Sequence, residues 1–114
     1  MPEKRRVLFL VTGDPRSSGK IVEAIRMAVG LRAWNALSVT VYLGGEAVAA
    51  LNEFPEELVD GVMLRDLLPD LIGQNGIVLV PRGTSMPAAG TIREVDYVEL
   101  ARLAASHDHV MRIA

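Results

Sequence analysis

Three short glycine-containing segments of the chain could hold a ligand, and two of them also carry polar or basic side chains. The first, residues 12–20, reads TGDPRSSGK, the second is Gly44-Gly45, and the third, residues 82–90, reads RGTSMPAAG. Hydroxyl, guanidinium and ammonium groups bind small anions, and free amides at the start of a helix add to that binding. The candidate ligand-binding residues are Thr12, Asp14, Arg16, Ser17, Ser18, Lys20, Arg82, Thr84 and Ser85.

The first of these segments is similar to the phosphate-binding loop of nucleotide triphosphatases, but it departs from that loop in two ways. The spacing from Gly13 to Gly19 is one residue too long, and Ile21 stands where a magnesium-binding serine or threonine belongs. We therefore predict no nucleotide triphosphatase. An ordinary helix start, in which Ser17 or Ser18 caps the first amides, accounts for the same residues.

The sequence also contains residues that resemble parts of a serine hydrolase or a metal site, but it predicts neither. Ser85 follows Gly83 as a hydrolase nucleophile does, but Pro87 replaces the second glycine of that tight turn. The two histidines, His107 and His109, precede the last expected strand, and a five-residue strand of roughly 16 Å separates that end of the sheet from Ser85. No third ligand accompanies the histidines, so we expect no metal ion.

Composition excludes further classes of function. The chain contains no cysteine, which removes thiol catalysis, disulfides and zinc–thiolate sites. Its formal net charge of −2 is spread along the chain, so neither nucleic acid nor a membrane is an expected partner. The apolar run at residues 7–11 is too short for a signal peptide or a membrane span, and we expect a cytoplasmic location. No cofactor is predicted; a flavin is only a third alternative for the first segment.

The remaining pattern indicates one α/β domain over residues 1–114, because a chain of 114 residues with half of them apolar buries a single core. Continuous apolar runs predict strands buried on both faces, and β-branched or shorter runs predict the others. The expected strands are residues 7–11, 39–43, 77–80, 92–95 and 110–113. Helices between them give a mainly parallel sheet of about five strands that is covered on both faces.

Two helices are expected in the first half of the chain. Apolar residues recur at helical spacing from Ser18 to Trp34, and a shorter helix covers residues 46–52. The acidic stretch from Glu53 to Asp60 is expected to be an exposed connection. The residues that we expect on the inner face of the first helix are Ile21, Ala24, Ile25, Ala28 and Arg32.

Two further helices are expected in the second half. One surrounds residues 67–72, and it tolerates Pro69 only if that proline lies in the first turn. The other begins at a capping box made by Asp96 and Glu99 and continues through Ser106. Its expected buried residues are Tyr97, Leu100, Ala101 and Ala104.

Such a sheet binds ligands beyond the carboxyl ends of its strands. The three polar segments each follow an expected strand, so all three are predicted at that edge. The candidate ligand-binding residues are thereby expected to face one crevice, whatever the ligand is.

The order of these features resembles the DsrE/DsrF-like family over nearly the whole chain. The resemblance lies in the first strand with its polar turn and helix, the strand that ends in Gly44-Gly45, residues 78–90, and the final helix and strand at 96–113. It implies a flavodoxin-like three-layer sandwich that forms homo-oligomers, often trimers or hexamers. In the sulfur-relay members a cysteine carries a persulfide; Ser85 matches that cysteine here, and a hydroxyl cannot store sulfane sulfur.

We therefore expect a DsrE/F-like homo-oligomer that binds a small anionic ligand or a protein partner and does not transfer sulfur. Two alternatives stay open: a purely structural subunit, and a nucleotide- or phosphate-dependent enzyme in which Lys20 and Arg82 stabilise charge while Asp14 or Ser85 moves a proton. Apolar residues in the expected connections either form the subunit interface or fold back on the core: Val59, Val62, Met63, Leu64, Met86 and Pro87.

Overall fold

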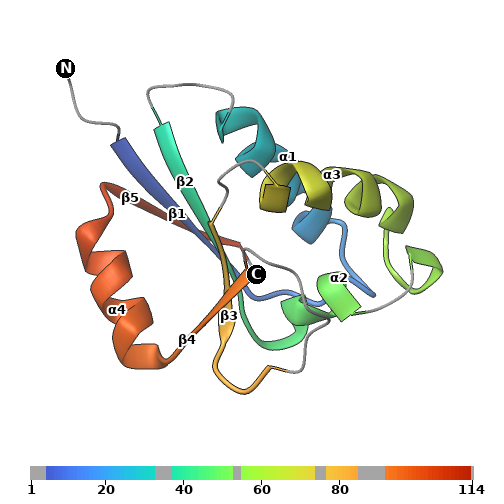
Figure 1. The fold of residues 1–114 in the computed structure, drawn as a ribbon. Helices are drawn as coiled ribbons and strands as arrows, with labels where there is room; N and C mark the ends of the chain where they lie inside the picture. Colours follow the sequence, from blue (N-terminus) through green and yellow to red (C-terminus); the bar gives the residue numbers. More distant parts are fainter. Residues whose placement is uncertain (1–4, 33–36, 53–54, 74–76, 85–91, 114) are drawn as a thin grey trace.

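The computed structural model describes residues 5–32, 37–52, 55–73, 77–84 and 92–113. Strands and helices alternate along it as the sequence predicts (Figure 1). The 3₁₀ turns Gly45–Val48 and Pro55–Glu57 precede α2 and α3, respectively. The elements are β1 (Arg5–Val11), α1 (Lys20–Arg32), β2 (Leu37–Leu43), α2 (Ala49–Asn52), α3 (Gly61–Gly73), β3 (Ile77–Pro81), β4 (Ile92–Val95), α4 (Tyr97–Ser106) and β5 (His109–Ile113).

The strands form a parallel sheet of five strands in the order β4-β3-β2-β1-β5. From β1 through β4 the chain moves in one direction across the sheet, and from β4 to β5 it crosses back to the opposite edge. Right-handed crossovers then require α1 and α3 on one face and α4 on the opposite face, which is the arrangement seen in Figure 1. The predicted α/β sandwich with helices on both faces is confirmed.

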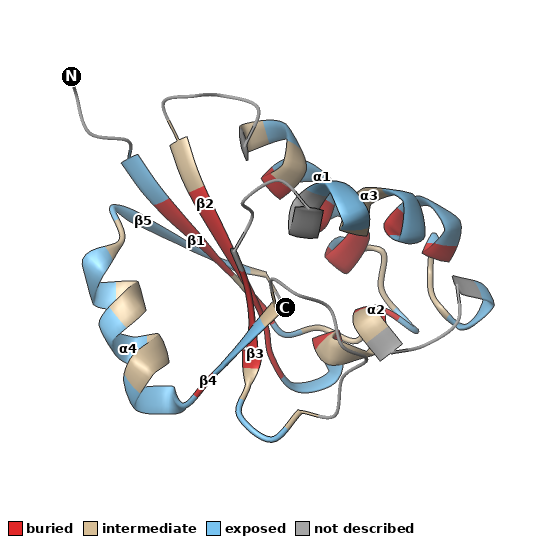
Figure 2. Cartoon of the chain, in the orientation of Figure 1, coloured by how far each residue is buried: buried red, intermediate tan, exposed pale blue. Residues whose placement is uncertain are grey.

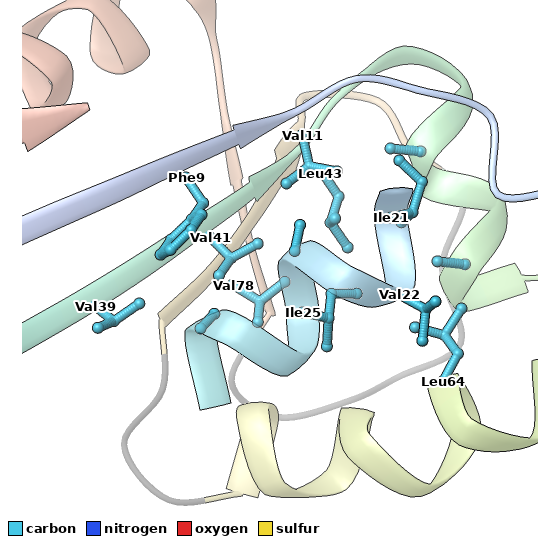
Figure 3. Packing of buried hydrophobic residues seen from close by; sticks show 14 of the residues in the cluster. Phe9, Val11, Ile21, Val22, Ile25, Val39, Val41, Leu43, Leu64 and Val78 are labelled. Carbon is cyan, nitrogen blue, oxygen red and sulfur yellow. The ribbon is translucent and has the colours of Figure 1, made fainter. Parts of the chain in front are cut away.

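The larger part of the core lies between the sheet and α1 with α3 (Figure 3). Alternate residues of β1 and β2, including Phe9 and Val41, point toward α1, where Ile21 and Ile25 meet them. All four side chains are at most 1% exposed. The expected inward residues Ile21, Ala24, Ile25 and Ala28 are all buried, whereas the side chain of Arg32 and all of Trp34 lie outside what the structure describes.

On the opposite face, which we call the α4 face, α4 is the one helix among the described residues that covers the sheet (Figure 2). Leu8, Tyr42, Leu79 and Val95 are buried there. Leu100, Leu103 and Ala104 pack against them but are only half-buried, and no residue of α4 is fully buried. Two expectations for this helix are therefore wrong, because Tyr97 is 82% exposed and Ala101 is exposed as well.

The reason lies in the geometry of α4. Leu100, Leu103 and Ala104 are spaced three and four residues apart and so share one face, whereas Ala101 is rotated by about 100° from Leu100. Tyr97 is the first residue of the helix. The predicted capping box is confirmed, since Asp96 accepts a hydrogen bond from the Glu99 amide at 2.8 Å.

The expectation for Pro69 is also wrong, because α3 begins at Gly61 and contains this proline in its interior. An interior proline removes one backbone hydrogen bond and costs about 3 kcal/mol or more. Pro69 and Arg65, whose carbonyl loses that bond, are both exposed, so water can replace it. Leu64 on the inner face is 1% exposed, and its packing offsets the cost.

This longer α3 also corrects the expected connecting segments. Val62, Met63 and Leu64 are helical, and only Leu64 turns into the core; Val62 is 58% and Met63 is 41% exposed. Val59 is half-buried in the turn before α3, and Met86 and Pro87 lie outside the described residues. Within the described part of the chain no helix has the length and apolar character needed to cross a membrane.

Candidate functional site

The carboxyl ends of the strands bring the three polar segments to one edge of the sheet. Beyond β1 the amide of Thr12 donates to the Ile113 carbonyl at 2.9 Å, and beyond β2 the Gly44 amide donates to the Val11 carbonyl at 2.9 Å. Beyond β3 the Arg82 amide donates to the Val95 carbonyl at 3.0 Å. Before it leaves the sheet, each segment thus makes one further backbone hydrogen bond to the last residue of an adjacent strand.

The first segment satisfies most of its own polar groups. Arg16 donates to the Asp14 carboxylate from its amide at 2.9 Å and from its guanidinium Nε at 3.0 Å. These hydrogen bonds hold the pKa of Asp14 below its usual value. The amides of Ser17 and Ser18 donate to the Asp14 carbonyl at 3.1 and 3.0 Å. The segment is a closed turn in which the guanidinium of Arg16 already has a carboxylate beside it.

The start of α1 is arranged as an ordinary helix start. The Ser18 hydroxyl accepts a hydrogen bond from the Lys20 amide at 3.2 Å, as the capping alternative predicts. Ile21 is fully buried in the core. Asp60 approaches from the turn before α3, and its carboxylate oxygen would lie 3.7 Å from a Cβ atom placed on Gly19. Lys20 is exposed, and no ion pair of its side chain is found among the residues that the structure describes.

Arg82 in the third segment belongs to a network with the start of α4. Its guanidinium donates to Glu99 Oε1 at 2.6 Å and lies 3.7 Å from Asp96 Oδ2. Glu99 also pairs with Arg93 at 3.4 Å. Thr84 donates from its hydroxyl to the Pro81 carbonyl at 2.6 Å, which closes the turn after β3. Ser85, the residue matched to the sulfur-relay cysteine, lies outside the described residues.

A pocket of about 200 Å³ opens beside this network, on the α4 face. We call it the tyrosine pocket; its lining residues are Tyr42, Pro81, Arg82, Val95, Asp96 and Tyr97. Burial raises the pKa of Tyr42, and the nearby Tyr97 raises it further. Of the predicted ligand-binding residues that the structure describes, only Arg82 lines this pocket.

Neither tyrosine was predicted as a site residue from the sequence. Tyr42 stands next to the last residue of β2, and Tyr97 opens α4 directly after β4. One signal was present in the sequence, because the chain contains only these two tyrosines and each lies at the carboxyl edge of the predicted sheet. The face of the sheet on which Tyr42 lies was not evident from the sequence.

The first segment and the tyrosine pocket are separate places. The first segment leads into α1 on one face, whereas the pocket lies on the α4 face. The strands β1 and β3 that carry Thr12 and Arg82 are also separated by β2, which places them about 10 Å apart at the usual strand spacing. The predicted residues that the structure describes therefore lie in two places rather than around one crevice.

A second, wider hollow of about 500 Å³ lies at the start of α3; its lining residues are Glu56, Leu58, Asp60, Gly61, Val62, Met63 and Arg65. Charged and exposed side chains predominate there. Asp60 has a positive φ of 53°, as its turn into α3 requires. Among its described lining residues only Gly61 is buried, so no large buried side chain forms a wall as Tyr42 and Val95 do in the tyrosine pocket.

The histidines lie at the other end of the sheet. His109 begins β5 and is in register with Val7, while His107 contacts the Leu103 carbonyl and, at 3.5 Å, the Thr40 hydroxyl. Within the described residues no group of three or more potential metal ligands is found.

Comparison with known proteins supports the fold. No family model matches the chain, and no curated protein matches it. Among solved structures the chain is similar to the crystal structure of the ychN protein from E. coli, with a TM-score of 0.79 and 23% sequence identity. The match covers 96% of this chain and 99% of that chain. It supports the predicted DsrE-like fold over nearly the whole length.

Proposed function

We propose that this protein is an oligomeric, cysteine-free binding protein of the DsrE-like fold, and that its small-molecule ligand occupies the tyrosine pocket. The pocket carries the proposal, since it combines two phenol rings and a guanidinium at the carboxyl edge of a parallel sheet, where such folds bind ligands. Sulfur transfer is not proposed, because the chain has no thiol on which a persulfide can form.

The location of the pocket modifies the expectation of an anionic ligand. Arg82 retains its predicted role at the edge of the site, but Arg16 is engaged with Asp14 in the segment that leads into α1. A ligand in the tyrosine pocket therefore meets one guanidinium and two aromatic rings rather than a cluster of cations. Binding through ring contacts is the function that this arrangement favours.

Self-association is the second part of the proposal. Large apolar side chains are exposed on both faces, which favours burial against further copies of the chain. The family resemblance adds trimers or hexamers as the expected assemblies. The exposed apolar residues among those described are Met27, Val62, Met63, Tyr97, Val98, Val110 and Met111.

A native mass spectrum of freshly purified protein tests both parts. We expect a discrete trimer or hexamer that carries extra mass of a few hundred daltons or less, and we expect that mass to disappear under denaturing conditions. The Tyr97→Ala variant should lose the extra mass, because it removes one wall of the pocket at a position where folding does not depend on the side chain. A bare monomer from gently handled protein would contradict the assembly and leave the ligand proposal without support.

A further inference from the structure

The size, the walls and the rim charges of the tyrosine pocket restrict the ligands that it can hold. Resting on the proposed function, we infer that the pocket takes a neutral, planar, single-ring ligand that carries a hydrogen-bond acceptor, in preference to an anion of the same shape. The argument depends on the volume of the pocket, its walls, the charges already paired at its rim and the donors that face it.

Volume limits the ligand to one ring. The pocket has about 200 Å³. An apolar cavity of about 150 Å³ is known to hold benzene, whereas pockets for drug-sized ligands have about 300–1,000 Å³. A single substituted ring therefore fills the space, and a dinucleotide or a flavin exceeds it.

The walls favour a flat ligand. Tyr42 is 5% exposed, and its ring folds back over Gly44 so closely that a Cβ atom there would lie 2.5 Å from Tyr42 Cε1. The missing side chain at Gly44 thus sets the position of the ring. Val95 adds a buried aliphatic wall, and Tyr97 adds a ring that is 82% exposed and accessible for stacking.

The positive charge at the rim is already compensated. The Arg82 guanidinium contacts Glu99 at 2.6 Å and lies 3.7 Å from Asp96, and Asp96 itself lines the pocket. An incoming carboxylate would have to compete with Glu99 for Arg82 while facing the charge of Asp96. At the start of α4 the Glu99 amide already donates to Asp96 and is not available to an incoming anion. An anion is therefore disfavoured.

The groups that can recognise a neutral ligand are hydrogen-bond donors. Burial and the neighbouring Tyr97 raise the pKa of Tyr42, so its phenol keeps its proton at neutral pH and can donate. The charged groups near this phenol are Arg82 and Asp96 at the rim, with Glu99 and Arg93 behind them. A carbonyl or amide oxygen on the ring is the acceptor that matches the phenol.

The two tyrosines make the test direct, because the chain has no others and both line the pocket. Full-length protein with ¹³C-labelled tyrosine rings gives two sets of ring signals, which Tyr42→Phe and Tyr97→Phe assign. Benzamide and benzoate serve as probes of matched shape that differ in charge. We expect benzamide to shift both sets of signals and to bind at least ten-fold more tightly than benzoate at neutral pH.

Three variants sharpen this test. Tyr42→Phe should lower the affinity for benzamide about three- to ten-fold, as expected for the loss of one hydrogen bond. Glu99→Gln removes the carboxylate that pairs with Arg82. The difference in affinity between benzamide and benzoate should therefore become smaller or reverse. Asp66→Asn removes a carboxylate that pairs with Arg65 on α3, away from the pocket, and should leave both affinities unchanged.

The outcomes separate the two proposals. Benzoate that binds as tightly as benzamide in the unmodified protein would overturn the selectivity while leaving the pocket as a ligand site. If neither probe shifts either tyrosine at concentrations of tens of millimolar, both the selectivity and the proposed site are wrong.

Discussion

The two faces of the sheet are built differently. On the face covered by α1 and α3, strand and helix side chains such as Phe9, Ile25 and Leu64 are at most 1% exposed. On the α4 face a single helix with no fully buried residue covers the sheet, and Tyr97 and Val98 at its start are exposed. The comparison indicates that one face provides most of the stability, while the other leaves room for a pocket. Four predictions test this difference.

The largest expected effect compares one leucine on each face. Leu64→Ala leaves a cavity under α3 and should lower the free energy of unfolding by about 2–5 kcal/mol. Leu103→Ala on α4 removes the same atoms from a half-buried position and should cost less than half as much. Urea unfolding monitored by circular dichroism measures both. Equal losses of unfolding free energy in the two variants would show that both faces contribute equally to stability, which would contradict this comparison.

The next effect concerns the glycine under Tyr42. Gly44→Ala places a Cβ atom 2.5 Å from Tyr42 Cε1, so the ring must move, at a cost of about 1–3 kcal/mol. Benzamide binding should fall with it. Gly30→Ala in α1 is the matched control, since nothing lies within 4 Å of its Cβ position, and it should stabilise the helix by about 0.5–1 kcal/mol. Unchanged binding in Gly44→Ala would contradict the fixed position of the ring.

A smaller effect is expected at the cap of α4. Asp96→Ala removes the capping box and should lower stability by about 1 kcal/mol. It also removes a negative charge from the pocket, so benzoate should bind more tightly than to the unmodified protein. Asp66→Ala on α3 is exposed and serves as the control, with a change within about 0.5 kcal/mol. A cap variant with unaltered benzoate affinity would argue against charge selection at the rim.

The smallest effect depends on pH. Because the folded state raises the pKa of Tyr42 above its usual 10.0, the unfolded chain loses this phenolic proton first as pH rises. The ionisation of Tyr42 should therefore leave the free energy of unfolding unchanged below pH about 10 and should lower it above that pH. Tyr42→Phe should reduce the decline, whereas Tyr97→Phe should leave most of it. Urea unfolding from pH 8 to 11 gives the slopes, and identical slopes in the two variants would be inconsistent with a buried Tyr42.

Much of the fold was predictable because its signals are local. The apolar runs of β1 and β3 indicate strands buried on both faces, and the Asp96–Glu99 spacing indicates the capping box of α4. Pro69 was misjudged because the packing of Leu64 outweighs a local preference, and such packing is not visible in sequence periodicity.

The site was less predictable because it depends on contacts between distant residues. Arg82 and Glu99 are 17 positions apart and pair only after β4 brings α4 beside the turn that follows β3. A strand buried on both faces also shows no alternation of polar residues, so the sequence of β2 does not indicate which face carries Tyr42. Arg16 and Arg82 were visible in sequence, but their pairing with Asp14 and Glu99 was not.

The most direct test locates a bound probe between the two tyrosine rings. Intermolecular nuclear Overhauser effects between benzamide and full-length protein should connect the probe to the rings of Tyr42 and Tyr97 and to the methyl groups of Val95, which line the pocket together. Contacts to the methyl groups of Val62 and Met63 instead would place the ligand in the hollow at α3 and contradict the assignment of the site to the α4 face.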